Sequence, residues 1–213
     1  MATMPVTAKI CGLSTPDTLD AALSAGASHV GFVLYPSSPR HLAPGKAGAL
    51  AARVPNDVRR LAVLVDPDDA LVDAALAAGF DTLQLHGTAA SRVAAIRART
   101  GREIWAALPI KTRADLAAAY AYAGSADRLL YDAKTPPGAT LPGGMGLRFD
   151  WGLLDGFRHP LPWALSGGLD AGNVGEAIRR TGATLVDVSS GVESAPGVKD
   201  VDKIAAFLHA IPR

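Results

Sequence analysis

The stretch VTAKICG, residues 6–12, is the first of a series of strand-like segments and ends on the only cysteine of the 213-residue chain. Its composition predicts a β-strand, in which side chains alternate between two faces. Lys9 and Cys11 then share one face, and Ala8 and Ile10 share the other. A lone cysteine is most often a small buried hydrophobic residue. Whether Cys11 has a chemical role therefore depends on where the other strand-like segments end.

The same pattern recurs along the chain: a short β-rich run, a polar or glycine-bearing break, and a helical stretch. Eight runs follow this pattern, at residues 6–11, 29–35, 61–65, 82–86, 103–108, 128–132, 161–165 and 184–189. The helical stretches carry start and stop signals. Residues 14–17 supply a cap, a first-turn proline and an early carboxylate, and Gly26 follows where a left-handed terminating residue is expected. We expect similar helix starts at residues 66–68, at Asp170 and at Asp200.

Alternating strands and helices imply parallel pairing, in either an open doubly wound sheet or a closed barrel. An open sheet would be expected to carry a glycine-rich dinucleotide fingerprint, which residues 11–14 lack. Eight units of about 27 residues each favour a single α/β domain over residues 1–213, a (β/α)₈ or TIM barrel of minimal size. Residues 133–160 are rich in Gly and Pro, with a short helical candidate around 150–154, so we expect the sixth helix to be shortened or irregular.

Composition excludes several classes of partner. With 21 basic and 20 acidic residues, the chain has no electrostatic footprint for nucleic acid or for an anionic membrane surface. No apolar run is long enough to span a bilayer, and residues 1–7 lack the features of a secretion signal. One cysteine cannot form an intrachain disulfide. The sequence therefore predicts a cytoplasmic protein with a small-molecule partner.

Reactive and charged residues gather at the carboxyl ends of the predicted strands, where barrels of this kind carry their chemistry. Cys11, Arg40, His86 and Asp132 all lie at or just after such ends. The loops on the opposite side of the barrel offer mostly Gly and Ala. This asymmetry favours a chemical role for Cys11 over simple core packing.

The last two strand ends carry a second signal. Gly167 and Gly168 follow the seventh run, and Ser189, Ser190 and Gly191 follow the eighth. Backbone N–H groups there can face an anion without obstruction by side chains, with a short helical turn expected at residues 192–194. Either glycine segment alone could simply form a tight turn, but two on neighbouring strands favour a phosphate-binding cup.

Six segments stand in order along nearly the whole chain: KICG (9–12), GFVLYPSSPR (31–40), QLHG (84–87), LYDAK (130–134), FDW (149–151) and VDVSSGVE (186–193). Together they resemble the motifs of the phosphoribosylanthranilate isomerase family. Residues 143–146 depart mildly from the family pattern, since methionine stands where threonine is common. The resemblance implies an Amadori rearrangement of N-(5-phosphoribosyl)anthranilate in tryptophan biosynthesis, with no metal and no cofactor.

The resemblance also implies roles for individual residues. Asp132 matches the general acid, which needs a pKa raised by burial, and Cys11 matches the general base. Cys11 acts as a thiolate, which Lys9 or positive backbone ends nearby would favour. Arg40 matches the residue near the substrate's benzoate, where a guanidinium suits two-point binding of a carboxylate; the alternative is a solvated loop arginine.

Two further residues are assigned to the substrate-binding set with their roles left open. His86 is either a pocket wall, a proton carrier or a hydrogen-bonded structural residue. Asp187 points into the barrel by strand parity and either orients a ribose hydroxyl or neutralises Lys9. Because the first and eighth strands become neighbours when a barrel closes, we expect Lys9 and Asp187 to form an ion pair.

Other functions remain open from the sequence. A sister phosphate-binding barrel such as indole-glycerol-phosphate synthase would share the cup, and a non-catalytic phosphosugar-binding barrel would need neither Cys11 nor Asp132. A hydrolase with a cysteine nucleophile would want a histidine base, for which His86 is the candidate. Monomer and homodimer are both compatible with the sequence.

Overall fold

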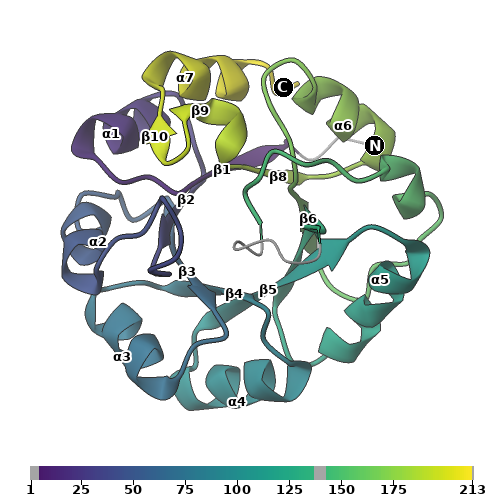
Figure 1. Ribbon diagram of the computed structural model, residues 1–213, viewed down its shortest axis with the longest axis horizontal. Coiled ribbons are helices and arrows are strands. Elements are labelled where there is room, and N and C mark those ends of the chain that lie inside the picture. Colours follow the sequence, from purple (N-terminus) through teal and green to yellow (C-terminus); the bar gives the residue numbers. More distant parts are fainter. Residues whose placement is uncertain (1–4, 137–142, 213) are drawn as a thin grey trace.

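Eight parallel strands form a closed barrel in this computed structural model, which describes residues 5–136 and 143–212. Each strand pairs with its neighbours in sequence order, and β8 pairs with β1 to close the ring. Figure 1 shows the strands as an inner ring with the helices outside it. The strands are β1 (Thr7–Cys11), β2 (His29–Val33), β3 (Arg59–Val65), β4 (Thr82–His86), β5 (Glu103–Ile110), β6 (Arg128–Ala133), β7 (Trp163–Leu165) and β8 (Leu185–Val188). The predicted (β/α)₈ architecture is confirmed.

The outer layer consists of α-helices, short 3₁₀ turns and one small hairpin. The helices are α1 (Pro16–Ser24), α2 (Pro44–Ala51), α3 (Asp69–Ala77), α4 (Ala90–Thr100), α5 (Arg113–Ala117), α6 (Val174–Thr181) and α7 (Val201–His209). The 3₁₀ turns are η1 (Ala118–Tyr122), η2 (Trp151–Leu154) and η3 (Ser190–Val192). The hairpin joins β9 (Glu193–Ala195) to β10 (Val198–Lys199).

Helix starts agree with the expected caps at three of four positions. The side chain of Thr15 accepts a hydrogen bond from the backbone of α1, and Asp68 and Asp200 do the same for α3 and α7. Gly26 follows α1 with a φ of +92°, as expected for a left-handed residue. Local side-chain chemistry therefore fixes these helix ends.

The prediction that Asp170 caps a helix is wrong, because α6 begins four residues later, after Asn173. The Asp170 carboxylate accepts from Gly172 N at 2.8 Å instead, which makes an Asx turn. The Asn173 side chain accepts from Asp170 N at 3.0 Å and donates to Gly168 O at 3.0 Å. The segment before α6 is thus fastened to the loop that follows β7.

The sixth unit has the shortened helix that the sequence predicts. Between β6 and β7, the described residues contain only the 3₁₀ turn η2. Asp150 starts it, since its carboxylate accepts from Gly152 N at 2.9 Å. The long segment before η2 approaches the carboxyl end of the barrel, where residues 143–147 line the central cavity.

Side chains inside the barrel form layers along its axis. One apolar cluster consists of Leu61, Trp105, Ala107, Leu130, Ala164 and Leu185. Cys11, Val33 and Val63 form a second apolar cluster that faces the cavity. The much larger core, between the strands and the helices, is also apolar. The interior therefore has a filled apolar layer and a cavity at the carboxyl ends of its strands.

Lys9 is fully buried inside this barrel and forms an ion pair with Asp187. The two residues are register partners on β1 and β8, and Lys9 Nζ lies 2.7 Å from Asp187 Oδ1. Asp187 Oδ2 also accepts from the Ser166 hydroxyl at 3.0 Å. Burial by itself lowers the pKa of Lys9, but the Asp187 carboxylate and Cys11 together outweigh burial, so the net pKa is raised. The predicted side-chain parity and the predicted pairing are both confirmed.

In the two described ranges, no helix combines the length and the apolar character needed to cross a bilayer.

Lys9→Met should destabilise the protein strongly, by about 3–5 kcal/mol, because it leaves the Asp187 carboxylate buried without a cation. The double variant Lys9→Met, Asp187→Leu should recover much of that loss, since it removes both charges together. Urea unfolding of the wild-type protein, the two single variants and the double variant measures the coupling free energy. Strictly additive losses would contradict a mutually dependent buried pair.

Candidate active site

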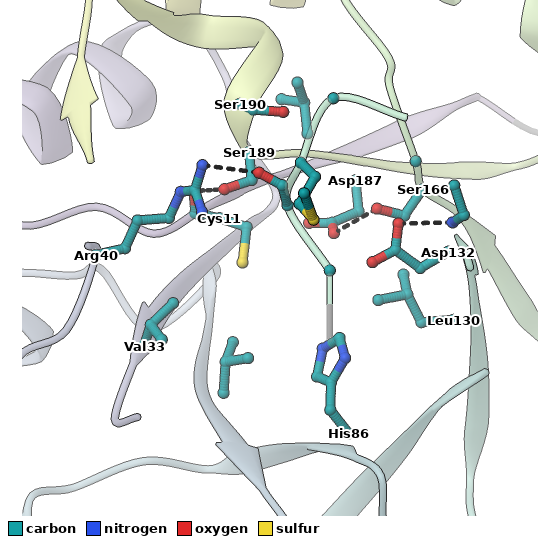
Figure 2. Close-up of a pocket in the computed structure, with 18 of the residues that line it drawn as sticks. Cys11, Val33, Arg40, His86, Leu130, Asp132, Ser166, Asp187, Ser189 and Ser190 are labelled. Carbon is teal, nitrogen blue, oxygen red and sulfur yellow. Dashed lines mark hydrogen bonds between the residues drawn. The ribbon is translucent and has the colours of Figure 1, made fainter. Parts of the chain in front are cut away.

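A single cleft at the carboxyl ends of the strands brings together nine of the ten residues expected at the site. The nine that line it are Cys11, Arg40, His86, Asp132, Gly167, Gly168, Asp187, Ser189 and Ser190. Figure 2 shows Arg40 and Asp132 entering from opposite sides, with the Cys11 sulfur directed into the space between them. Side chains that lie up to 179 positions apart in the sequence therefore share one cavity because their strand ends meet on one rim.

Asp132 is a buried carboxyl group near the end of β6. Its Oδ1 accepts a hydrogen bond from Ala133 N at 2.9 Å. Burial, reinforced by the nearby Asp187 carboxylate, raises the pKa of Asp132 to about 7. The Ala133 N–H and the charges of Lys9 and Arg40 offset only part of that rise. A carboxyl group that titrates near neutral pH is suited to general acid catalysis.

Cys11 ends β1 and is the only cysteine in the chain. Burial raises the pKa of its thiol, and the Asp187 carboxylate raises it further. Lys9 and Lys199 lower the Cys11 pKa, as expected for cations, but the net change is upward. Lys9 therefore favours the thiolate as expected, but burial, the largest effect, outweighs it.

His86 ends β4 and lies with its Nε2 2.8 Å from the side-chain amide of Gln84. Burial, and then the positive charge of Lys9, lowers the pKa of His86 to about 4. The imidazole is therefore neutral at neutral pH. This ionisation state favours a pocket wall over a carrier that cycles through a charged form.

Arg40 is only 5% exposed, so it is not a solvated loop residue. Its Nε and Nη2 donate to the two carboxylate oxygens of Glu193, each at 2.7 Å. Nη2 also donates to Gly144 O at 3.0 Å. The two-point carboxylate contact that suits an arginine is thus made within the protein, with Glu193.

The strand-end glycines adopt conformations that other residues disfavour. Gly167 has a φ of +90° and Gly168 a φ of +62°. A Cβ atom at Gly168 would lie 2.7 Å from Leu147 O and 2.8 Å from Gly146 O. Gly168 therefore allows residues 146–147 to approach the rim directly.

The loop after β8 differs in detail from the expectation. The helical turn predicted at residues 192–194 occurs two residues earlier, as η3, and Glu193 already belongs to β9. Gly191 is absent from the residues that line the cleft. A Cβ atom there would collide with the carbonyl oxygen of Leu169, so this glycine permits close packing of the two loops that form the cup.

Sequence reasoning missed several residues of the site. Lys199 Nζ lies 2.7 Å from Glu193 Oε1 and donates to Ser189 O at 2.8 Å. Ser166 lines the cleft directly before Gly167, and residues 143–147 line it from the segment after β6. Ser166 could have been found from its place at a strand end. The pairing of Glu193 with Lys199 could not, because it depends on the β9–β10 hairpin, which no periodic pattern marks.

Within residues 5–136 and 143–212, no group of three or more His, Cys, Asp or Glu side chains is arranged to share a metal ion.

Comparisons with known proteins agree with the architecture. Residues 8–210 match the family model described as N-(5'-phosphoribosyl)anthranilate (PRA) isomerase. An N-(5'-phosphoribosyl)anthranilate isomerase of Zymomonas mobilis subsp. mobilis is 54% identical over 210 residues, which cover 98% of this chain and 99% of that protein. The isomerase of Azorhizobium caulinodans is 55% identical over 98% of this chain and 92% of that protein.

Solved structures give the same relationship. Phosphoribosyl anthranilate isomerase from Thermotoga maritima superposes with a TM-score of 0.86 at 32% identity, covering 97% of this chain and 98% of that chain. A second similar structure, with a TM-score of 0.81 and 31% identity over 97% of this chain and 98% of that chain, is a phosphoribosyl anthranilate isomerase in complex with reduced 1-(o-carboxyphenylamino)-1-deoxyribulose 5-phosphate.

Asp132→Asn should be more stable than the wild-type protein at pH 8 and close to it at pH 4. The folded-state pKa of Asp132, about 7, exceeds that of an unfolded aspartate, about 3.9. Stability associated with the protonated group is therefore present below pH 4 and is lost as the pH rises through 7. Urea unfolding at the two pH values measures the difference.

Asp115→Asn is a control of opposite sign. In the wild-type protein, a hydrogen bond from Lys134 is the main cause that lowers the pKa of the Asp115 carboxyl group to about 2. Replacing this carboxylate by asparagine should therefore give no gain in stability at pH 8. A gain for Asp132→Asn that is equal at pH 4 and pH 8 would contradict the raised pKa.

Proposed function

The chain belongs to the N-(5'-phosphoribosyl)anthranilate isomerase family, and we propose that it isomerises N-(5'-phosphoribosyl)anthranilate with Asp132 as general acid and Cys11 as general base. The protein is an isomerase of tryptophan biosynthesis. The residue assignment is supported by one observation: a single cavity contains a carboxyl group with a pKa of about 7, a thiol and a glycine-lined rim. The reaction needs no redox partner, since substrate and product are isomers.

The first step opens the furanose ring. The anilino nitrogen donates its lone pair to C1, the bond from C1 to the ring oxygen breaks, and that oxygen takes a proton. Asp132 supplies the proton, because burial and the neighbouring Asp187 keep a large share of this carboxyl group protonated at neutral pH. The carboxylate that results is stabilised by the N–H of Ala133.

The second step removes the proton from C2 of the protonated imine. The electron pair of the C2–H bond forms a C1–C2 double bond while the C1–N double bond returns its electron pair to nitrogen. The resulting enol-amine becomes the ketone when C1 gains a proton and the C2 hydroxyl loses one. Cys11 acts as the base, and its thiolate forms against the burial that disfavours it, so only a small fraction is ionised at any moment. The positive charge on the imine itself favours a nearby thiolate.

The orientation of the substrate follows from the two ends of the cavity. The phosphate group lies in the cup formed by Gly167, Gly168, Ser189 and Ser190, where backbone N–H groups and hydroxyls are the donors, and Gly191 supports the cup by packing on Leu169. The carboxylate of the anthranilate lies at Arg40. His86 forms a wall between these ends, and Asp187 acts mainly by neutralising Lys9.

We propose that the protein acts in the cytoplasm as a monomer or a homodimer, with the phosphoribosyl anthranilate as its small-molecule partner. One similar structure, with a TM-score of 0.83 and 32% identity, describes monomers generated from the dimeric isomerase of Thermotoga maritima.

Cys11→Ser and Asp132→Asn should each lower kcat by at least ~10², because each removes one positioned proton-transfer group. Affinity for the product should stay within a few-fold of wild type. The assay generates N-(5'-phosphoribosyl)anthranilate in the presence of the protein and follows the loss of its fluorescence. Turnover near the wild-type level in either variant would overturn that residue's role, and a wild-type protein that gives no acceleration over buffer would remove the isomerase assignment.

The pH profile separates the two roles within the same assay. The productive form has Asp132 protonated and Cys11 ionised. The two groups titrate in the opposite order, because Asp132 loses its proton near pH 7 and Cys11 loses its proton at higher pH. The wild-type kcat/KM should therefore rise through about pH 7 and fall where the thiol ionises. The residual activity of Asp132→Asn should instead keep rising until the thiol ionises. A variant that retains the rise near pH 7 would show that another group causes it.

Ser190→Asp should raise the inhibition constant of a phosphate-bearing product analogue by at least ~10²-fold, because a carboxylate at the cup repels the phosphate dianion. Ser194→Asp, on the exposed part of the β9–β10 hairpin, adds the same charge and should change that constant little. This pair is cleaner than Gly168→Val, which would also displace residues 146–147. Equal effects of the two charges would contradict the proposed orientation.

A further inference from the structure

Arg40, Glu193 and Lys199 form a buried three-charge cluster beside the cleft, and the reaction steps above use only Arg40. The side chains of Arg40 and Glu193 are 6% and 5% exposed, and that of Lys199 is fully buried. Glu193 receives Nε and Nη2 of Arg40 on its two oxygens and Lys199 Nζ on Oε1, all at 2.7 Å. Burying three ionic groups costs desolvation free energy, and apolar side chains could fill the same space without that cost.

The two-point contact between Arg40 and Glu193 determines which part of the Arg40 guanidinium faces the cleft. A guanidinium is planar, so two bonds to one carboxylate fix both its position and its plane. Glu193 occupies the Nε–Nη2 edge, which leaves Nη1 as the nitrogen for which the described residues supply no acceptor. Figure 2 shows the Arg40 head group at the side of the cavity opposite Asp132.

Lys199 holds Glu193 in turn. The two residues are register partners in the β9–β10 hairpin, and Lys199 Nζ also donates to Ser189 O at 2.8 Å. The Ser189 hydroxyl donates to Cys11 O at 3.2 Å. The cluster is therefore anchored to the end of β1 and to the loop after β8, which are parts of the cavity itself.

We propose that Glu193 is a positioning residue, which holds the Arg40 guanidinium so that its Nη1 edge binds the ring carboxylate of the substrate. Lys199 stabilises Glu193, so the cluster keeps a net positive charge for an anionic group while Arg40 stays fixed. This inference rests on the proposed function. It means that Glu193, on the β9–β10 hairpin, contributes to the preference for a substrate whose aromatic ring carries a carboxylate. The same charge on a free arginine would attract an anion without orienting it.

A merely structural role for Glu193 would predict a different result from a positioning role. Loss of a purely structural ion pair would weaken the binding of all ligands of the cavity equally, or would leave the binding of all of them unchanged. Loss of the positioning contact affects only ligands that carry the ring carboxylate. The decisive quantity is therefore the preference for a carboxylated ligand over its analogue without the carboxylate.

The experiment compares two stable reduced analogues of the product, with and without the carboxylate on the phenyl ring. Wild type should bind the carboxylated analogue at least ~10-fold more tightly. Glu193→Gln should reduce that preference to within ~3-fold while binding of the other analogue stays unchanged, and KM should rise more than kcat falls. Ser194→Ala, on the same hairpin and outside the cleft, is the matched control and should behave as wild type.

A double-mutant cycle with Arg40→Met tests whether Glu193 acts through Arg40. Arg40→Met should abolish the preference, and adding Glu193→Gln to it should cause no further loss. If Glu193→Gln does not fold, Glu193→Asp carries the test, since it keeps the charge but shortens the reach and should weaken the preference. An unchanged preference in the variant, or equal loss for both analogues, would overturn the inference. If the wild-type protein itself fails to isomerise the substrate, the proposed function fails instead.

Discussion

A fully buried lysine inside the barrel requires an adjacent opposite charge, and this constraint organises the centre of the molecule. Lys9 on β1 meets Asp187 on β8 at 2.7 Å, at the seam where the barrel closes. Neither charge is tolerable there alone, because water cannot solvate it. The pair therefore couples closure of the barrel to the electrostatics of the cavity that adjoins it, since both side chains also act on the ionisable groups of the rim.

Burial and the Lys9–Asp187 pair together give three neighbouring groups different ionisation states. Asp187 adds to burial in raising the pKa of Asp132, while Lys9 adds to burial in lowering that of His86. At Cys11 the two members act in opposite directions, so burial decides and the thiol is held mostly protonated. A carboxylic acid, a neutral imidazole and a thiol therefore coexist at neutral pH without any of them carrying a full charge. Such a cavity is suited to a substrate that brings its own charges, a phosphate and a carboxylate.

Features governed by local chemistry were predictable from the sequence, and those governed by loop geometry were not. Strand order, the inward parity of Lys9 and the caps at Thr15, Asp68 and Asp200 follow from short-range pattern, and closure of the barrel then brings Lys9 to Asp187. The position of η3, the Asx turn at Asp170 and the bond between Arg40 and Glu193 depend on how irregular loops fold onto one another. The net rise of the Cys11 pKa was not predictable from the sequence either, since it depends on a balance of burial against the charges of Lys9, Asp187 and Lys199.

The two halves of the rim are built by different means, and this difference explains which substitutions each half tolerates. The phosphate side relies on backbone, so glycine is required at Gly168 and Gly191, where a side chain would strike the carbonyl groups of neighbouring loops. The Arg40 side relies on charged side chains that hold one another through Glu193 and Lys199. Gly144 joins the halves, since its carbonyl accepts from Arg40 within the segment whose residues 146–147 lie over Gly168. A change in that segment therefore affects both ends of the cavity together, while a change at Glu193 affects one.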